Sequence, residues 1–246
     1  MMQAIIFAAG LGTRLKPMTD TRPKALVEID GHPLLWHVIM KLKSAGFTRI
    51  VVNVHHFASQ IIDYLNANDH FGLDIRISDE RARLLDTGGG IKAAASLFSP
   101  TSPILIHNVD IFSNVDVAAF YQSIGKADAA LLVSSRETSR YLVFNDAMQL
   151  RGWVNVKTGE RKNESLFAGE STLIRAFSGI HVFSPRLFQQ MQSWPEAFGI
   201  IDFYLQACIQ HEIRGVEMEG LQLLDVGKAD SLQAATSLYL QGAFGS

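Results

Sequence analysis

Short apolar runs alternate with segments of helical spacing along the first half of the chain. Residues 4–9 form an uninterrupted apolar run closed by Gly10, which is typical of a strand buried on both faces of a parallel sheet. Residues 33–45 carry an apolar stripe at helical spacing that ends before Gly46, a common residue after a helix. The same reasoning predicts strands at 49–54, 73–77 and 103–107 and helices at 57–68 and 90–98. This alternation predicts an α/β fold, Rossmann-like and doubly wound around a mixed, mostly parallel sheet.

The second half of the chain has a different pattern. Mostly strand-like segments, separated by polar turns, favour mixed or antiparallel strands that form a lid or an edge over a site. These segments are 129–134, 141–144, 150–156 and 174–183. Helices are predicted at 200–210 and 228–241, on either side of a last short strand that ends at 225–227. Because we find no repeat of about 20 to 50 residues and no low-complexity tract, we expect a single domain over residues 1–246.

Composition argues against several classes of protein. The 246 residues include 22 Lys and Arg against 24 Asp and Glu, so the chain lacks the basic excess of a dedicated nucleic-acid binder. No apolar stretch approaches the ~20 residues that a membrane-spanning helix needs. The single cysteine, Cys208, cannot form a disulfide within the chain, which is consistent with a reducing compartment. We therefore expect a cytoplasmic protein with no nucleic-acid or membrane partner.

A basic loop that contains glycine follows the first predicted strand. Between Gly10 and Lys24, four basic residues oppose one acidic residue, so a chain of net charge −2 concentrates +3 charges in one short segment. The basic residues are Arg14, Lys16, Arg22 and Lys24, and the acidic residue is Asp20. Glycine lets backbone N–H groups approach an anion, and arginine offers a planar fork to phosphate oxygens. Because α/β folds bind ligands at the carboxyl ends of strands, the loop predicts a polyphosphate site.

Two well-known phosphate loops do not match this segment. A Walker A loop needs Gly-Lys followed by Ser or Thr, which is absent here. The dinucleotide fingerprint requires a third glycine where this chain has Leu15, which weakens a nicotinamide-dependent dehydrogenase as an alternative.

The loop reads Ala-Ala-Gly-x-Gly-Thr-Arg-Leu-x-Pro over 8–17 and Pro-Lys over 23–24. This pattern resembles the signature of the sugar-1-phosphate nucleotidyltransferases. In that family the loop wraps the triphosphate of the incoming nucleotide, and its Arg and Lys neutralise phosphates. The resemblance implies catalytic roles for Arg14 and Lys24. It also implies nucleotide contacts for Ala9, Gly10, Gly12, Thr13, Arg14 and Lys24.

Three later segments resemble further parts of the family pattern. The turn Leu-Asp-Thr-Gly-Gly-Gly-Ile over 85–91 implies nucleotide-base contacts from Thr87 and Gly88. Asn-Val-Asp, ending at Asp110, resembles the strand-end motif whose aspartate is catalytic and binds the metal, and Asp-Val-Gly, starting at Asp225, resembles the source of a second carboxylate. A lone aspartate at a strand end is about as often a cap or a turn former. Together, however, the two suit Mg²⁺, which commonly takes one or two protein carboxylates plus substrate phosphates, so Mg²⁺ is the expected cofactor.

The sugar side of the expected site is less well defined. Phe-Ser-Gly-Ile-His-Val-Phe over 177–183 resembles the strand that faces the sugar, which implies substrate contacts from Ser178 and Gly179, although it also reads as an ordinary core strand. Many relatives hold the sugar phosphate with the lysine of a Glu-Lys-Pro element, and this chain has none. Lys157 or Arg151 could replace that lysine, and we expect Asn155, in the same segment as Lys157, to contact the substrate.

Trp153 and three histidines are considered as further sugar-binding or metal-binding residues. Trp153 could stack on a sugar ring, but packing is the commoner role for tryptophan on a strand. His55 and His56 are adjacent on a predicted strand end and point to opposite faces, so they cannot chelate one ion together. His107 is expected at the edge of the core.

Among the members of this family, the chain looks most like the N-acetylmuramic acid 1-phosphate uridylyltransferases. Mannose-1-phosphate guanylyltransferases and heptose-phosphate relatives share much of the pattern. After Asp225 the sequence has no room for the hexapeptide-repeat β-helix of some bifunctional relatives. The resemblance implies a nucleotide half over about 1–115 and a sugar-phosphate half over about 116–246.

The implied reaction is in-line attack by a sugar 1-phosphate oxygen on the α-phosphorus of a nucleoside triphosphate. It gives a nucleotide-diphospho-sugar and pyrophosphate, with no covalent enzyme intermediate and no general base. The expected partners are therefore the nucleoside triphosphate and the sugar 1-phosphate, bound by a monomer or a homodimer. Guanylyl transfer to mannose 1-phosphate, cytidylyl transfer to phosphocholine and a non-catalytic nucleotide-sugar sensor are the alternatives. Intact Arg14, Lys24, Asp110 and Asp225 favour catalysis.

Overall fold

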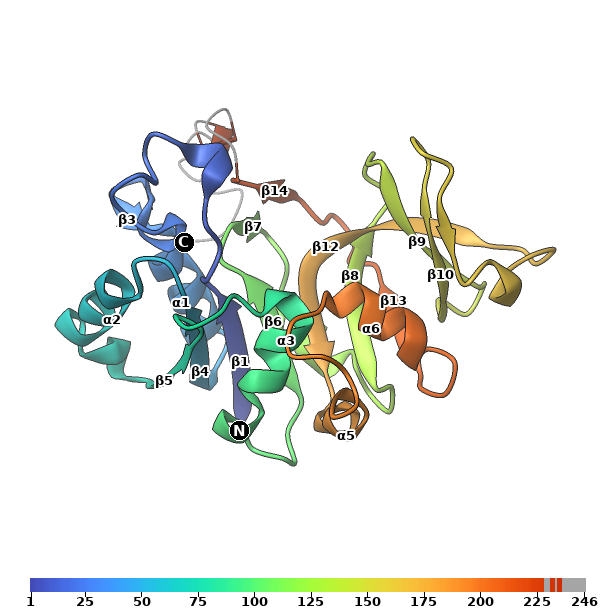
Figure 1. The fold of residues 1–246 in the computed structure, drawn as a ribbon, viewed down its shortest axis with the longest axis horizontal. Coiled ribbons are helices and arrows are strands. Elements are labelled where there is room, and N and C mark those ends of the chain that lie inside the picture. Colours follow the sequence, from blue (N-terminus) through green and yellow to red (C-terminus); the bar gives the residue numbers. More distant parts are fainter. Residues whose placement is uncertain (228–230, 233, 236–246) are drawn as a thin grey trace.

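The computed structural model describes residues 1–227, 231–232 and 234–235, which Figure 1 shows as a ribbon. A ten-stranded sheet runs through the molecule. Eight of its strands lie in the order β11 (Arg161–Lys162), β10 (Leu150–Asn155), β9 (Arg140–Phe144), β12 (Leu173–Phe183), β6 (Ile104–Asn108), β1 (Met2–Phe7), β4 (Phe47–Val54) and β5 (Asp74–Asp79). The other two are β8 (Ala129–Ser134), which pairs with β12, and β13 (Ile213–Val216), which pairs with β8.

Parallel pairing is concentrated in the first half of the chain. β1 lies parallel to β4 and to β6, and β4 lies parallel to β5. β12 is antiparallel to β6, β8 and β9, and the antiparallel arrangement continues through β10 to the edge strand β11. The mixed α/β sheet is therefore confirmed, and the antiparallel strands predicted for the second half do form one edge of it.

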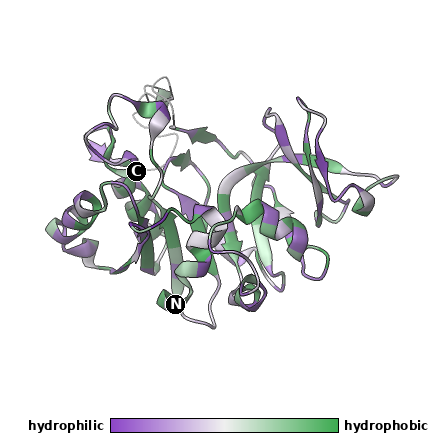
Figure 2. Cartoon of the chain, viewed as in Figure 1, coloured by the Kyte–Doolittle hydropathy of each residue, from purple (hydrophilic) through white to green (hydrophobic). Residues whose placement is uncertain are grey.

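Helices cover both faces of the sheet. α1 (Leu34–Ser44), α2 (Ala58–Ala67) and α4 (Val117–Gln122) pack in one apolar cluster, whereas α3 (Asp86–Ala93), α5 (Phe188–Met191) and α6 (Ile200–Ala207) pack in another. The side chains of β1 alternate between the two clusters, because successive residues of a strand point to opposite faces. From residue 4 onward β1 is apolar on both faces, as its uninterrupted apolar run requires, and Figure 2 shows hydrophobic residues along the central strands.

The strand order places the site. The chain runs from β1 outward through β4 to β5 and then returns to the other side of β1 as β6. The connections after β1 and β6 therefore diverge, and such a crevice is where open α/β sheets bind ligands. Residues 8–10 and 109–110 leave the sheet at this point.

A small ribbon beside the sheet joins distant parts of the chain. β7 (Ile111–Ser113) follows the turn after β6 and pairs antiparallel with β14 (Leu223–Asp225). The N–H of Val226 donates to the carbonyl of Asp110 at 2.9 Å. The two predicted aspartate motifs therefore lie next to one another.

The other regular segments of the described chain are short. β2 (Glu28–Ile29) and β3 (His32–Pro33) form a two-stranded hairpin. Single turns of 3-10 helix occur at Thr13–Leu15, Lys24–Leu26, Asp69–Gly72, Ala95–Leu97, Glu164–Leu166 and Pro185–Leu187. None of the described helices combines the length and the apolar character needed to cross a membrane.

Several boundaries differ from the sequence predictions. α3 begins at Asp86 rather than at residue 90, because Gly88 and Gly89 let the first turn of the helix pack directly on the segment 196–198. α6 ends at Ala207, three residues before the predicted end. The pattern does not predict β7, α4 or β13, whose 3, 6 and 4 residues are too few to show a period. The helix predicted at 228–241 lies outside the described residues except at 231–232 and 234–235, which are helical.

Candidate functional site

A cavity of about 360 Å³ opens at the carboxyl ends of β1 and β6. The loop after β1, the start of α3 and the turn after β6 form its walls. Predicted site residues that line it are Ala9, Gly10, Lys24, Thr87 and Asp110. The cavity thus brings together residues from the loop after β1, from the segment 85–91 and from the Asn-Val-Asp motif that ends at Asp110.

Asn53, at the end of β4, fixes the loop that leaves β1. Its Oδ1 accepts the N–H of Ala8 at 2.6 Å and the N–H of Ala9 at 3.1 Å, and its Nδ2 donates to Glu80 Oε1 at 2.9 Å. Glu80 Oε2 accepts the N–H of Leu85 at 3.2 Å. Burial raises the pKa of Glu80 above its ordinary value, and the hydrogen bond from Asn53 opposes this rise. This buried pair therefore connects the loop after β1 to the turn that leads into α3.

Sequence reasoning missed Asn53 and Glu80, and one signal was available for the first. Asn53 is the only polar side chain in the otherwise apolar run 50–54, and it is 1% exposed. A buried polar side chain in such a strand must have partners, which directs attention to the neighbouring strand ends. Glu80 has no comparable signal, because its burial depends on contacts with β1 and α3.

Lys24 and Asp110 form an ion pair at the mouth of the cavity. Lys24 Nζ bonds to Asp110 Oδ2, and the Lys24 side chain is nine-tenths buried. The 3-10 turn Lys24–Leu26 begins directly after Pro23. The second half of the predicted basic motif therefore reaches the predicted metal carboxylate.

Arg14 lies beside the second aspartate motif. Gly12 precedes it with φ of 65°, a left-handed conformation that favours glycine. Arg14 Nη2 and Asp225 Oδ1 both lie 2.7 Å from the point where a Cβ on Gly227 would sit. Gly12, Thr13 and Arg14 do not line the cavity itself, so they form a second, exposed part of the site next to Asp225.

Asp110 and Asp225 offer two carboxylates to a divalent metal ion. Asp110 and Asp225 come from adjoining ends of the β7–β14 ribbon, and Asp225 Oδ1 also accepts the N–H of Gly227 at 2.8 Å. No cluster of three or more His, Cys, Asp or Glu side chains suited to a metal occurs in the described part of the chain. Two carboxylates completed by phosphate oxygens are a donor set that suits Mg²⁺, whereas a site made by protein groups alone is not available there.

The first turn of α3 is held by the segment that leads into α6. The N–H of Gly88 donates to the carbonyl of Phe198 at 2.8 Å, and the N–H of Thr87 donates to Asp86 Oδ1 at 2.6 Å. Thr87 Oγ1 accepts the N–H of Ile200 at 3.0 Å. Gly88 does not line the cavity, because the ring of Phe198 covers the place where its side chain would be. The N–H of Gly88 is therefore already bonded and is not available to a ligand.

The residues predicted to contact the sugar differ in how close they lie to the cavity. Gly179 has φ of 74°, and a Cβ on it would lie 2.9 Å from Nδ2 of Asn108, which lines the cavity. Ser178 is buried beside it, and its hydroxyl has no hydrogen-bond partner among the described residues. Asn155 does not line the cavity, and its Oδ1 accepts the N–H groups of Lys157 at 3.1 Å and Thr158 at 3.4 Å.

The two candidate replacements for the missing lysine also lie away from this cavity. Lys157 is exposed in the turn after β10, and Arg151 Nη2 donates to Gln149 Oε1 at 2.9 Å. Trp153 packs against the apolar cluster that contains α6, and Lys162 Nζ lies 5.3 Å from the centre of its ring.

Two histidines of the central strands are buried and neutral. His107 Nδ1 donates to the carbonyl of Asn108 at 2.7 Å, and burial lowers the pKa of His107 to about 3. Burial also lowers the pKa of His181 to about 3, and neither of its ring nitrogens has a partner among the described residues. His107 therefore lies deeper than the core-edge position predicted for it, and neither ring acts as a base near neutral pH.

Comparison with known proteins agrees with this arrangement. The family model described as the MobA-like NTP transferase domain matches residues 4–204. The protein belongs to that family. The resemblance that its glycine-containing basic loop shows to nucleotidyltransferases is thereby confirmed, and so is the enzyme class.

Individual relatives show how far the similarity extends. An N-acetylmuramate alpha-1-phosphate uridylyltransferase of Caulobacter vibrioides is 34% identical over 230 residues, which cover 89% of each chain. A mannose-1-phosphate guanyltransferase of Gibberella zeae is 29% identical over 245 residues, 97% of this chain and 64% of that protein. The crystal structure of a putative glucose-1-phosphate thymidylyltransferase from Bacillus anthracis has a TM-score of 0.80 at 20% identity, covering 100% of this chain and 98% of that one. The structural match shows the same fold.

Proposed function

We propose that this protein transfers a nucleotidyl group from a nucleoside triphosphate to a sugar 1-phosphate and releases pyrophosphate. The observation that supports this most strongly is the cavity at the end of β1 and β6, where the Lys24–Asp110 ion pair meets the loop 8–10. Two polyanions must approach one another in this reaction, so the protein has to neutralise charge and align the reacting groups.

In the proposed reaction, one oxygen of the sugar phosphate forms a bond to the α-phosphorus. The bond from that phosphorus to the bridging oxygen of the β-phosphate breaks, and pyrophosphate leaves with the electron pair. Arg14 and Lys24 stabilise the negative charge that grows on the leaving pyrophosphate. The sugar phosphate is already ionised at neutral pH, so no general base is required, in keeping with the neutral state of His107.

The remaining predicted residues orient the two substrates. Backbone N–H groups of Gly10, Gly12 and Thr13 receive the triphosphate, and Thr87 frames the base. Ala9, whose N–H is bonded to Asn53, and Gly88, which Phe198 covers, stay predictions as nucleotide contacts. Ser178 and Gly179 face the sugar across Asn108. Asn155 stays a prediction as a substrate contact, and its Oδ1 is the less suitable for that role because it already accepts two backbone N–H groups.

Asp110 and Asp225 would hold Mg²⁺, which when bound neutralises phosphate charge and polarises the α-phosphorus. Lys24 holds Asp110 in place through their ion pair. Gly227 does the same for Asp225 through its N–H, and Arg14 adds positive charge beside that carboxylate.

For the substrates we propose UTP and N-acetylmuramic acid 1-phosphate. The support is the identity and the nearly complete mutual coverage with the Caulobacter vibrioides relative. Guanylyl transfer to mannose 1-phosphate is the second candidate, because the Gibberella zeae relative matches nearly the whole of this chain. A cytoplasmic location, the division near residue 115 and a monomeric or homodimeric state remain predictions.

The test measures pyrophosphate release with and without Mg²⁺. UTP, GTP, CTP and dTTP are each combined with N-acetylmuramic acid 1-phosphate, mannose 1-phosphate, glucose 1-phosphate and phosphocholine. We expect release to be highest for UTP with N-acetylmuramic acid 1-phosphate and to depend on Mg²⁺. A silent grid from folded protein would contradict the proposal and favour a nucleotide-sugar sensor.

Matched variants connect this assay to the site. Asp110→Asn should abolish Mg²⁺-dependent release, whereas Asp63→Asn, on the exposed side of α2, should leave it unchanged. Arg14→Ala should lower turnover by roughly a hundredfold, about 3 kcal/mol of lost charge stabilisation. Arg161→Ala is the control for Arg14, because Arg161 is exposed and pairs with Glu164 away from the cavity.

A further inference from the structure

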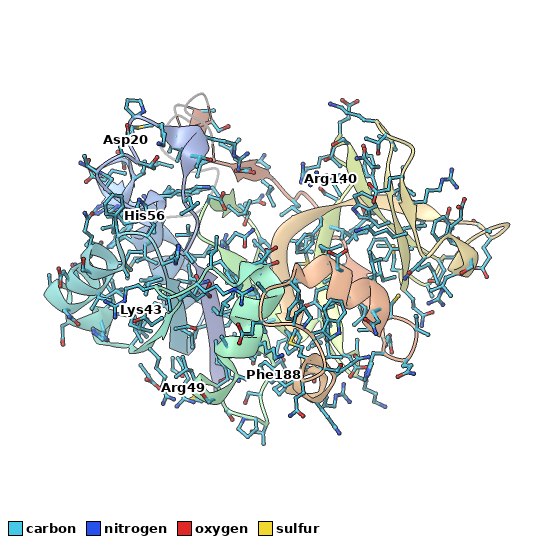
Figure 3. All side chains as sticks on the ribbon, in the orientation of Figure 1. Asp20, Lys43, Arg49, His56, Arg140 and Phe188 are labelled. Carbon is cyan, nitrogen blue, oxygen red and sulfur yellow. The ribbon has the colours of Figure 1, made fainter. Side chains whose placement is uncertain are left out.

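A second cavity of about 360 Å³ lies between α6 and the strands β9 and β10. Trp153 and Phe177 give it apolar walls, while its charged residues are Arg136, Arg140, Lys162 and Asp202. Figure 3 labels Arg140 on the side of the molecule that carries β9 and β10. Asn155, Ser178 and Gly179 do not line this cavity, whereas Trp153, considered above as a residue that could stack on a sugar, does.

The lining of this second cavity carries an excess of positive charge. Three cations oppose a single carboxylate, Asp202, and that carboxylate already pairs with Lys162 at 2.8 Å. Arg136 donates one hydrogen bond, from Nη2 to the carbonyl of Phe177 at 3.0 Å, and forms no ion pair within the described chain. The Arg140 guanidinium has neither an ion pair nor a hydrogen bond among the described residues. Two arginines therefore keep their charge and most of their N–H donors for a ligand.

The second cavity adjoins the first one at two places. Asp202, which lines the second cavity, and Asp86, which lines the first, have carboxylate oxygens 3.6 and 3.8 Å from the point where a Cβ on Gly199 would sit. On β12, Phe177 lines the second cavity, and Gly179, two residues later, abuts Asn108 of the first. One ligand that has its reacting end in the first cavity can therefore extend into the second.

We infer that the second cavity receives a carboxylate on the sugar, remote from the 1-phosphate, and that Arg136 and Arg140 select for it. The inference rests on the proposed function and deepens it. The class of substrate is a hexose 1-phosphate that carries a second anionic group. The lactyl ether of N-acetylmuramic acid has such a carboxylate, and so does a uronic acid.

The 1-phosphate itself belongs in the first cavity. It must reach the α-phosphorus, and Lys24 is the cation that lines that cavity, beside the carboxyl groups of Asp110, Glu80 and Asp86. An anion bound by Arg136 and Arg140 is therefore a different group of the same molecule. Trp153 and Phe177 give the carbon skeleton between the two anions an apolar surface.

The experiment compares pairs of substrates of which one member has the group that carries the carboxylate and the other lacks it. N-acetylmuramic acid 1-phosphate is paired with N-acetylglucosamine 1-phosphate, which lacks the lactyl ether, and glucuronic acid 1-phosphate is paired with glucose 1-phosphate. Both kcat/KM with UTP and Kd by calorimetry are measured for wild type, Arg136→Gln, Arg140→Gln and the double variant. The control is Arg161→Gln, which removes a positive charge outside both cavities.

We expect each single variant to lower kcat/KM and affinity for a carboxylate-bearing sugar by about ten- to a hundredfold. The values for its neutral counterpart should stay within about twofold. The substrate pair that shows this selective loss identifies whether the arginines bind a lactyl or a uronic carboxylate.

Equal losses for both members of a pair would overturn the inference and indicate that the arginines hold the 1-phosphate. Unchanged values in the double variant would overturn it too. Turnover without any preference for the carboxylate would leave the proposed function standing and remove the inference. Selective loss of affinity for the carboxylate-bearing sugars, in a protein that turns over none of the substrates, would support the inference and contradict the proposed function.

Discussion

Replacing Asn53 by alanine removes the link between β4, the loop after β1 and Glu80. Three buried hydrogen bonds are lost, at 2.6 and 3.1 Å from the N–H groups of Ala8 and Ala9 and at 2.9 Å to Glu80. A buried N–H left without a partner costs about 1–3 kcal/mol, so the two N–H groups together should lower the free energy of unfolding by about 4 kcal/mol. The loop 8–10 also loses its fixed orientation, so nucleotide affinity should fall beyond what the loss of stability explains.

Urea unfolding followed by tryptophan fluorescence gives the free energy, and calorimetric titration with UTP and with GTP gives the affinity. Asn68→Ala is the matched control, because Asn68 is exposed and its hydrogen bond to the carbonyl of Tyr64 can be replaced by water. We expect the control to lie within about 0.5 kcal/mol of wild type. An Asn53→Ala protein within 1 kcal/mol of wild type, with unchanged nucleotide affinity, would refute the reasoning.

Asn53→Asp tests the same contacts in a second way. The aspartate keeps an acceptor for the N–H groups of Ala8 and Ala9 but places an oxygen against Glu80 Oε1, where wild type has a donor. Two carboxylates this close must share a proton, so one carboxyl pKa is raised in the folded state relative to the unfolded state. The folded state then takes up a proton on acidification, and the stability of this variant relative to wild type should increase from pH 7 to pH 5.

Two further predictions concern titration and packing. His181 has a folded pKa of about 3 against an ordinary 6.5, so its contribution to stability is complete above pH 6.5 and is lost as pH falls toward 3, by about 2 kcal/mol at pH 5. In His181→Leu, the number of protons taken up on unfolding at pH 4–6 should be smaller by about one. The slope of the free energy of unfolding against pH measures this number, and a slope equal to that of wild type would contradict the assignment. Gly89→Ala should destabilise by at least about 3 kcal/mol in urea unfolding, because its Cβ would collide with the carbonyl of Glu196 and backbone must move. Gly10→Ala, with nothing within 4 Å of its Cβ, should instead keep the stability of wild type and bind nucleotide more weakly; equal stability losses at the two glycines would refute this explanation.

The central part of the fold could be predicted from the sequence because its signals are local. The apolar run at the start of the chain lies largely in β1 and is buried on both faces, and its lack of polar residues alone indicates that environment. The basic loop follows it in sequence, so its place at a strand end needs no knowledge of distant contacts. Strand order adds the rest, since β6 lies beside β1 and brings Asp110 to Lys24.

The parts that were not predicted depend on contacts between distant segments. Glu80 becomes a buried carboxylate only because Asn53 and the turn before α3 close over it. Asn155 was placed at the substrate from its position in the chain, yet its side chain caps the turn that follows β10. The second cavity combines residues from β9 to β12 with α6, and Arg136 and Arg140 have no pattern in the sequence that marks them.

The most direct test of the proposed reaction follows the oxygen atoms of the sugar phosphate. The protein is supplied with UTP and with N-acetylmuramic acid 1-phosphate that carries ¹⁸O in its phosphate, and both products are analysed by mass spectrometry. Attack by the sugar phosphate on the α-phosphorus predicts that all the label remains in the nucleotide-diphospho-sugar and that pyrophosphate carries none. Label in the pyrophosphate, or an unlabelled nucleotide-sugar, would contradict direct nucleotidyl transfer at this site.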